Sequence, residues 1–289
     1  MIDVRHAPRP FLRTFLRSLP AVVLTVGLVA CSAAPGGGPG GGSGGDDPGS
    51  GSGGEPTTTL PHPAPSYEDP TVVDPTCVLD GHAFDDDVTI PEGVDCVFAR
   101  VDVDGNVVIS RGASLDATAG FFEGNVLVYP GASFTSFQTW IGGNVQAERA
   151  AGVDLDTVTV DGSVQTEATA VVRIEGGYVD GDVQPDDGGD VTLERATVGG
   201  NVQPTGNDAV RIAASIVDDL QPDDNSGPVV LEDNTVRGNL QAYGNGGLEI
   251  RDNIVWGDLQ CEDNVPDPIG GGNAVDGDAE GQCAGLALP

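Results

Sequence analysis

The chain has no lysine, only three histidines and few aromatic residues, and each shortage excludes a class of function. Its 12 basic residues are all arginines and stand against 45 acidic residues, which gives a formal net charge of −33. A field of this sign repels nucleic-acid phosphates. Without lysine the chain cannot perform Schiff-base chemistry or form a phosphate-cradling loop that ends in Lys-Ser/Thr. We therefore expect no nucleic-acid partner and no phosphate cofactor.

The histidines are too dispersed to build a catalytic triad or a histidine-rich metal site. His6 and His62 lie in the N-terminal quarter, and only His82 falls in the repetitive region that follows. Both kinds of site require imidazoles that converge in space. The sequence thus favours a protein that is not an enzyme and that has no cofactor, unless its acidic residues bind Ca²⁺.

Residues 1–30 have the composition of an export signal. Four arginines precede an apolar stretch from Leu19 to Ala30, which is too short to span a hydrocarbon core of about 30 Å. The segment ends in Leu28-Val29-Ala30-Cys31, which resembles the lipobox of bacterial lipoprotein precursors. The resemblance implies an acylated Cys31 that anchors the exported chain to the cell membrane or outer membrane, facing outside the cytoplasm. In the alternative, Cys31 is an ordinary residue beside a conventional cleavage site.

Residues 31–76 are predicted to be a disordered linker. Twelve glycines and nine prolines occur between positions 32 and 76, with no arginine. Segments of this composition do not bury enough apolar surface to fold. The sequence therefore divides into a signal (1–30), a lipid-anchored linker (31–76) and a third region (77–289).

A period of 19 residues runs through residues 77–289. Tetrapeptides of the Gly-Asn-Val type begin at Gly105, Gly124, Gly143, Gly162, Gly181, Gly200, Gly238 and Gly257. Near positions 217–220 one residue is missing, and a longer turn over 222–228 restores the register. Such regularity is the signature of a repeat architecture.

The apolar residues follow the same period and alternate with polar ones, as strands do. One column runs from Val103 to Val255 and another from Val107 to Leu259, and β-branched residues dominate both. The pattern predicts an all-β, single-stranded parallel β-helix (β-solenoid), right-handed, with about ten coils of 19 residues. Gly and Asn are expected at the corner, where the backbone is tight or left-handed.

The cysteines support export and stapled ends. Cys77 and Cys96 are one period apart, and Cys261 and Cys283 are 22 residues apart around the insertion at 270–273. Neighbouring coils place such positions about 4.8 Å apart, within reach of a disulfide. We predict the pairs Cys77–Cys96 and Cys261–Cys283, formed in an oxidising compartment.

Acidic residues are the remaining candidates for chemistry. Gln184-Pro185-Asp186-Asp187 recurs two coils later as Gln221-Pro222-Asp223-Asp224. Clustered carboxylates could bind Ca²⁺, and acids about 9.6 Å apart lie near the limit for inverting glycoside hydrolysis. The simpler interpretation is that these are solvated turns.

Two polar columns and the exposed aromatic residues complete the pattern. Asn106 heads a corner column of Asn and Asp, and Gln146 heads a column of glutamines that ends at Gln260. Both are interpreted as hydrogen-bonded structural ladders, with a glycan-binding strip as the alternative for glutamine. The exposed aromatic residues are assigned to different columns: Trp140, Tyr178, Tyr243 and Trp256. The arginines that lie singly between acids are interpreted as charge compensation.

Residues 77–283 resemble secreted bacterial β-solenoid proteins of uncharacterised function, through Gly-Asn-Val/Leu-Gln coils and the ending Leu259-Gln260-Cys261 to Gln282-Cys283. More distantly, the Gly-Asn-Val coils resemble bactofilins, which are polymer-forming cytoskeletal proteins. Neither resemblance supplies catalytic residues.

Our first functional hypothesis is a non-catalytic, lipid-anchored cell-envelope scaffold or adhesin-like module, with an envelope polysaccharide or surface protein as its partner. The second is a carbohydrate-active β-helix related to polysaccharide lyases or glycosidases, which rests on fold analogy. The third is a calcium-dependent surface assembly module.

Overall fold

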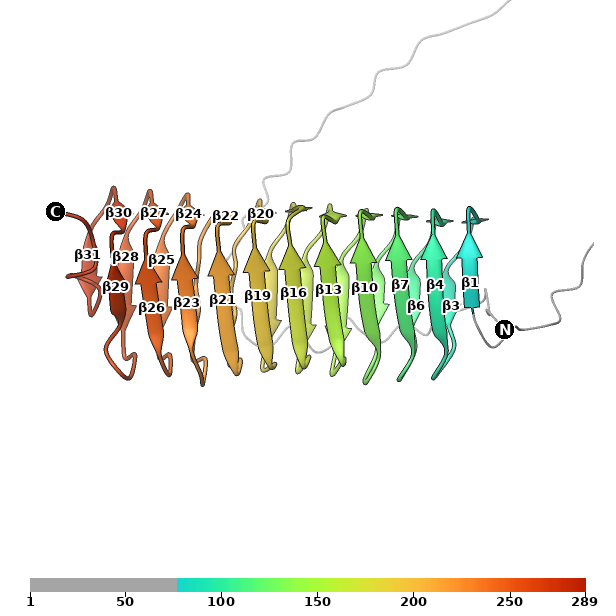
Figure 1. Cartoon of the computed structure of the whole chain (residues 1–289), viewed down its shortest axis with the longest axis horizontal. Coiled ribbons are helices and arrows are strands. Elements are labelled where there is room, and N and C mark those ends of the chain that lie inside the picture. The colour runs from blue at the N-terminus through green and yellow to red at the C-terminus, as the bar shows by residue number, and fades with distance from the viewer. Residues whose placement is uncertain (1–76) are drawn as a thin grey trace, which may run out of the picture. The chain divides into compact units, whose positions relative to one another are not determined.

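The computed structural model describes residues 77–289, which fold into a rod of eleven stacked coils (Figure 1). Nine of the coils have three short strands separated by corners, two coils have only isolated bridges in place of the third strand, and residues 77–289 contain no helix. All strand pairings join equivalent strands of adjacent coils in parallel, as in Val172 with Val191. The predicted all-β parallel β-solenoid is therefore confirmed.

The structure has one coil more than the sequence indicated. The last coil ends in β31 (Ala279–Gly281), where Gly277-Asp278-Ala279 replaces the Gly-Asn-Val motif. The corner between Asn264 and Ile269 also holds one extra residue, so that Glu249 pairs with Ile269 and Val255 with Val275 rather than with residue 274. The insertion predicted at 270–273 therefore lies just before β29 (Ile269–Gly271). Both changes hide this coil from a search for the 19-residue motif.

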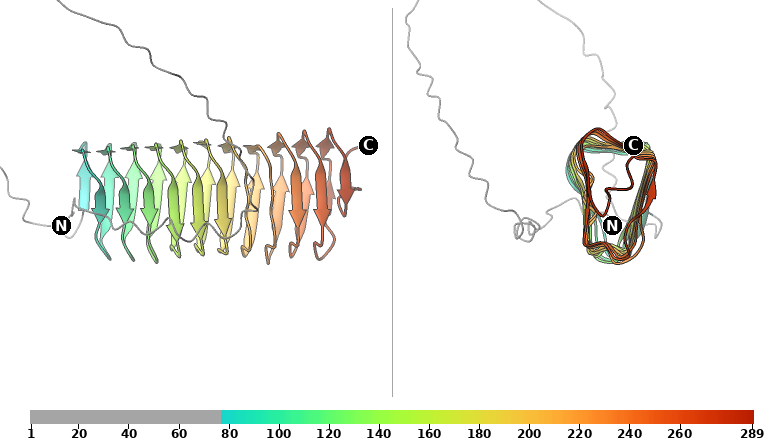
Figure 2. Two further views of the ribbon diagram at one scale, coloured as in Figure 1. Left: turned by 180° about the vertical axis from the view of Figure 1, so that it is seen from behind. Right: turned by 90° about the vertical axis from the view of Figure 1, so that its left-hand side faces the viewer.

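The strands stack into three flat faces, which the end-on view of Figure 2 shows as three sides around a common interior. Face B contains β1 (Cys77–Asp80), β4 (Asp95–Ala99), β7 (Ser114–Thr118), β10 (Ser133–Phe137), β13 (Gly152–Asp156), β16 (Val171–Glu175), β19 (Asp190–Glu194), β21 (Ala209–Ala213), β23 (Val229–Glu232), β26 (Leu248–Arg251) and β29 (Ile269–Gly271).

Face C follows face B along the chain and consists of two-residue strands. They are β2 (Ala83–Phe84), β5 (Asp102–Val103), β8 (Phe121–Phe122), β11 (Trp140–Ile141), β14 (Thr159–Val160), β17 (Tyr178–Val179), β20 (Thr197–Val198), β22 (Ile216–Val217), β24 (Thr235–Val236), β27 (Ile254–Val255) and β30 (Ala274–Val275).

Face A closes each coil and is divided into two blocks. Its strands are β3 (Val88–Ile90), β6 (Val107–Ile109), β9 (Val126–Val128), β12 (Val145–Glu148), β15 (Val164–Glu167), β18 (Val183–Asp186), and then β25 (Leu240–Tyr243), β28 (Leu259–Glu262) and β31. Between the blocks, Val202 and Leu220 make only isolated bridges. Pro204 and Pro222 occupy these two coils and have no N–H to donate to a ladder.

The interior is filled by the inward-facing columns of the three faces. Val103, Val160, Val198 and Leu240 have no solvent exposure. The largest buried side chains are Phe98, Phe122 and Phe134, all in coils two to four. Each large side chain buried in this way contributes roughly 1.5–3 kcal/mol to folding.

The corners combine close approach with left-handed backbone, but at different places. At the Gly-Asn corner between faces C and A, a Cβ on Gly124 would lie 2.5 Å from the carbonyl oxygen of Gly105. That corner requires glycine for space. The other two corners hold 13 non-glycine residues with φ between 49° and 57°, among them Arg100 and Asp233. The Gly-Asn corner is therefore tight, which is one of the two conformations predicted for it, and the left-handed conformation occurs at the other two corners.

Asparagine ladders follow all three corners. At the Gly-Asn corner, the Oδ1 of Asn125 accepts the backbone N–H of Asn144 at 2.8 Å, which confirms the predicted corner ladder. Two further ladders are buried and were missed from the sequence. They consist of Asn207, Asn225, Asn245 and Asn264 between faces A and B, and of Asn234, Asn253 and Asn273 between faces B and C.

Both predicted disulfides are present. Cys77 and Cys96 join the first two strands of face B, with their Cα atoms 4.4 Å apart. Cys261 and Cys283 join β28 to the C-terminal tail, with a Cα separation of 5.2 Å. The described rod is thus cross-linked near each end.

Candidate functional site

Face B carries a continuous network of ion pairs. The network runs through Arg173, Glu175, Arg195, Glu194, Arg211, Glu232, Arg251 and Glu249. Hydrogen bonds to Glu232 and Glu194 raise the pKa of Arg211 above its ordinary value. Four of the eight arginines after residue 76 form ion pairs in this network. The predicted charge compensation is therefore confirmed, because these arginines neutralise neighbouring carboxylates and do not form a basic binding patch.

Face A presents the predicted glutamine ladder. Along it, the Nε2 of Gln184 donates to the Oε1 of Gln203 at 2.8 Å, and Gln241 donates to Gln260 at 2.7 Å. The amides are half-buried and bonded to one another. This confirms the structural interpretation of the ladder, because each coil fixes the next through a side-chain bond.

The four acids proposed as calcium ligands lie beside the glutamine ladder. Asp186 and Asp223 share one outward column, with Thr205 in the coil between them. Asp187 and Asp224 lie at the following corner in the left-handed conformation. Within residues 77–289, no three His, Cys, Asp or Glu side chains converge to hold a metal ion. Calcium binding by these acids stays a prediction.

The paired acids have perturbed titration. Partial burial raises the pKa of Asp223 above its ordinary value, and the neighbouring carboxylate of Asp224 raises it further. The pKa of Asp186 is raised by the same two causes, partial burial and Asp187. Both acids therefore hold a proton more tightly than a fully solvated aspartate.

Face C has an outward column of a different kind. From coil three to coil ten it reads Phe121, Trp140, Thr159, Tyr178, Thr197, Ile216, Thr235 and Ile254, and it ends at Ala274 in coil eleven. From Trp140 to Ile254 large residues thus alternate with threonines, and Tyr178, Ile216 and Ile254 are 38–49% exposed. We call Trp140, Tyr178, Ile216 and Ile254 the ledges, and the threonine positions between them the slots.

The ledges correct the prediction that Trp140 and Tyr178 belong to different columns. They occupy the same column, two coils apart, with Thr159 between them. The mistake arose because the columns were traced through buried aliphatic residues, whereas this one is exposed and interrupted by threonine. A search for a 38-residue recurrence of large residues would have found it.

The aromatic ledges are held in place by their neighbours. Phe121 stacks on Trp140 with ring centroids 4.1 Å apart and an interplanar angle of 14°. The indole N–H of Trp140 donates to Oδ1 of Asp161 at 3.2 Å. The hydroxyl of Tyr178 donates to Asp180, which raises the pKa of the tyrosine. The polar atom of each ring is therefore already bonded within the rod.

Carboxylates flank the ledges. Two residues after the ledge column, on the same outward side, stand Asp104, Glu123, Asp161, Asp180 and Asp218, which we call the carboxylate column. Gly142 and Gly199 interrupt it where the rings of Trp140 and Tyr178 extend over the sheet. In the last coils Arg237, Trp256 and Asp276 follow. Face C thus combines apolar ledges with a line of negative charge.

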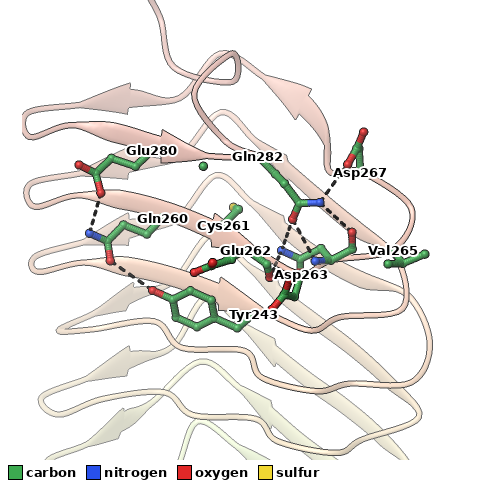
Figure 3. A pocket seen from close by; sticks show the side chains of 11 residues that line it. Tyr243, Gln260, Cys261, Glu262, Asp263, Val265, Asp267, Glu280 and Gln282 are labelled. Carbon is green, nitrogen blue, oxygen red and sulfur yellow. Dashed lines mark hydrogen bonds between the residues drawn. The ribbon is translucent and has the colours of Figure 1, made fainter.

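A hollow of about 950 Å³ lies beside β28 and β31 at the C-terminal end of the rod (Figure 3). It is lined by Tyr243, Glu262, Asp263, Val265, Asp267 and Glu280, among others. Gln282 crosses it, donating to Oδ1 of Asp267 at 2.9 Å and accepting the N–H of Asn264 at 2.9 Å. The hollow is acidic, and its amides mainly bond the end of the eleventh coil to the tenth.

The predicted signal, the linker and the lipidation site at Cys31 lie outside the described residues. Within residues 77–289, no helix is long and apolar enough to cross a bilayer. The chain matches no protein-family model, no curated protein and no solved structure.

Proposed function

We propose that this protein is a non-catalytic, lipid-anchored scaffold or adhesin-like module of the cell envelope. In this proposal, Cys31 is acylated and the following linker connects the anchor to the rod. The two disulfides agree with an oxidising compartment outside the cytoplasm.

The observation that carries the proposal is the ledge column of face C. It continues over successive coils with an unchanged two-coil repeat, from Trp140 to Ile254. An exposed apolar column on an otherwise acidic rod marks an interaction surface. A periodic surface of this length matches a linear partner better than a compact substrate.

The test is a binding screen with the full chain against envelope polysaccharides and surface proteins, with and without Ca²⁺. We expect saturable binding without release of product. Hydrolysis or elimination of a polysaccharide that is lost in Asp186→Asn or Asp223→Asn would overturn the proposal.

The carbohydrate-active alternative has one observation in its favour. Asp186 and Asp223 share a column about 9.6 Å apart, close to the upper separation for an inverting pair, and each has a raised pKa, as a general acid needs. The same screen distinguishes it by product release. Light scattering with Ca²⁺ or chelator tests the calcium-dependent assembly, for which an unchanged signal is the contrary result.

A further inference from the structure

We propose that face C binds an extended, basic, proline-rich protein segment in the polyproline II conformation. The proposal rests on the scaffold function above and names the chemical class of its partner. Three features support it: the spacing of the ledges, the chemistry of the slots and the charge beside them.

The spacing of the ledges matches the pitch of a polyproline II helix. Coils repeat at about 4.8 Å, so ledges two coils apart are separated by about 9.6 Å. Polyproline II has three residues per turn and a rise of 3.1 Å, which gives about 9.3 Å per turn. Over the three intervals from Trp140 to Ile254 the mismatch accumulates to only about 1 Å. A β-strand, with side chains on one side every ~6.7 Å, does not keep this register.

The slots suit every third residue of such a helix. Each slot has a threonine at its base and a large apolar residue on either side, as Thr197 has Tyr178 and Ile216. A proline ring packs between apolar walls, and the threonine hydroxyl can donate to a carbonyl that polyproline II leaves unpaired. Aromatic-lined surfaces are the usual receptors for this conformation.

The charge beside the ledges selects a basic partner. Asp161 and Asp180 line one side of the first two slots and are exposed, whereas Asp218 at the end of the second slot is paired with Arg237. A helix that places one residue of each triplet in a slot directs a second toward this carboxylate column. Lysine or arginine at that position gains attraction and faster association. A second copy of this chain would set two carboxylate columns against each other, which argues against self-association through face C.

The test uses the full chain and synthetic peptides of equal length. Peptides of repeated Pro-Pro-Lys, Pro-Pro-Glu and Gly-Ser-Lys triplets are titrated by calorimetry, together with an unbranched β-1,4-linked glucose oligomer. We expect Pro-Pro-Lys to bind, to bind more weakly in high salt, and to bind more tightly than the other three. Equal binding of Gly-Ser-Lys would reduce the effect to unspecific charge attraction and overturn the proposal.

Two variants test the ledges and slots themselves. Thr197→Ile fills a slot and Ile216→Thr removes a ledge, and both residue types already occur in this column. Each should weaken Pro-Pro-Lys binding by about tenfold. The control Thr192→Ile makes the same change on face B and should leave the affinity unaltered.

The outcomes separate this proposal from the scaffold function. Unchanged affinity in both face C variants, or preferential binding of the glucose oligomer, would overturn the polyproline proposal and leave a non-catalytic scaffold in place. Release of shorter sugars from the oligomer would instead overturn the scaffold function itself.

Discussion

The two ends of the rod are stabilised by different interactions although the coils share one backbone geometry. Coils two to four bury Phe98, Phe122 and Phe134, and their corners between faces B and C hold small or apolar residues such as Val101 and Gly120. In the later coils the same corner column carries Asn234, Asn253 and Asn273, all almost completely buried. The N-terminal coils therefore depend on apolar area, and the C-terminal coils on hydrogen-bonded amide ladders.

The difference shows two ways of holding neighbouring coils in register. Apolar packing favours burial but permits small shifts in register, because dispersion is not directional. A buried amide bonds to both neighbouring coils at once: Nδ2 of Asn245 donates to the backbone carbonyl of Pro222 in one coil and to the side-chain Oδ1 of Asn264 in the other, both at 3.0 Å. The ladders thus specify the register of the coils around the one that lacks a residue.

The largest effect should come from the apolar end. Phe134→Ala removes a fully buried ring and should lower the free energy of unfolding by about 3–5 kcal/mol, because the cavity cannot collapse between fixed coils. Denaturant unfolding measures it. Thr135→Ala, on the exposed side of the same strand, is the control and should change stability by less than about 0.5 kcal/mol. Equal losses of unfolding free energy in Phe134→Ala and Thr135→Ala would show that the buried ring does not stabilise this end of the rod.

Loss of a disulfide should cost about 3 kcal/mol at either end, for closed loops of about 20 residues. We expect Cys77→Ser/Cys96→Ser to increase hydrogen exchange in β1 and β4 only, and Cys261→Ser/Cys283→Ser to do so in β28 and β31. Exchange that spreads through the whole rod would show that the ends do not unfold independently.

Breaking an amide ladder should have a somewhat smaller effect. Asn245→Ala leaves the carbonyl of Pro222 and the amide of Asn225 without their partners, at a cost of about 2–3 kcal/mol. Asn144→Ala in the half-exposed corner ladder should cost about 1 kcal/mol, because water replaces the lost bonds. If the two variants lose the same free energy of unfolding, burial does not determine how much each ladder contributes to stability.

The smallest effect is the pH dependence of face A. The folded state raises the pKa of Asp223 above 3.8, so the folded protein holds this proton more tightly than the unfolded chain. The contribution of Asp223 to stability is then greatest at low pH and declines as the pH rises from about 3.8 through the raised pKa. Asp223→Asn should flatten the stability curve in that window, and Asp116→Asn on face B serves as the charge-matched control. If stability falls more steeply with pH in Asp223→Asn than in the unaltered protein, the direction of the pKa shift assigned to Asp223 is wrong.

The fold could be predicted because the signal repeats. A core position such as Val103 recurs at every coil, and a strand stacked on its own copy needs the same residue type each time. The disulfides followed from the same argument, since Cys77 and Cys96 are one coil apart. The eleventh coil was missed because its corner motif and its spacing both change.

Less of the candidate site was predictable. The buried ladders were missed because Asn207, Asn225 and Asn245 are spaced by 18 and 20 residues, which a strict period overlooks. The ledges were missed because exposed positions tolerate threonine and tyrosine equally, so one column holds both. In the sequence, the charge network of face B appears only as single arginines between acids. Which arginine pairs with which glutamate of a neighbouring coil depends on the conformations of the long side chains, and the sequence does not specify these.

The disulfide at the first strand also determines how the rod responds to pulling. Tension applied through the chain before residue 77 would ordinarily peel the first coil away, one backbone bond at a time. Cys77 is bonded to Cys96 in the second coil, so the load passes through a covalent link and bypasses the residues between them. The first coil is thereby shielded from force, and mechanical unravelling from this end must begin beyond Cys96.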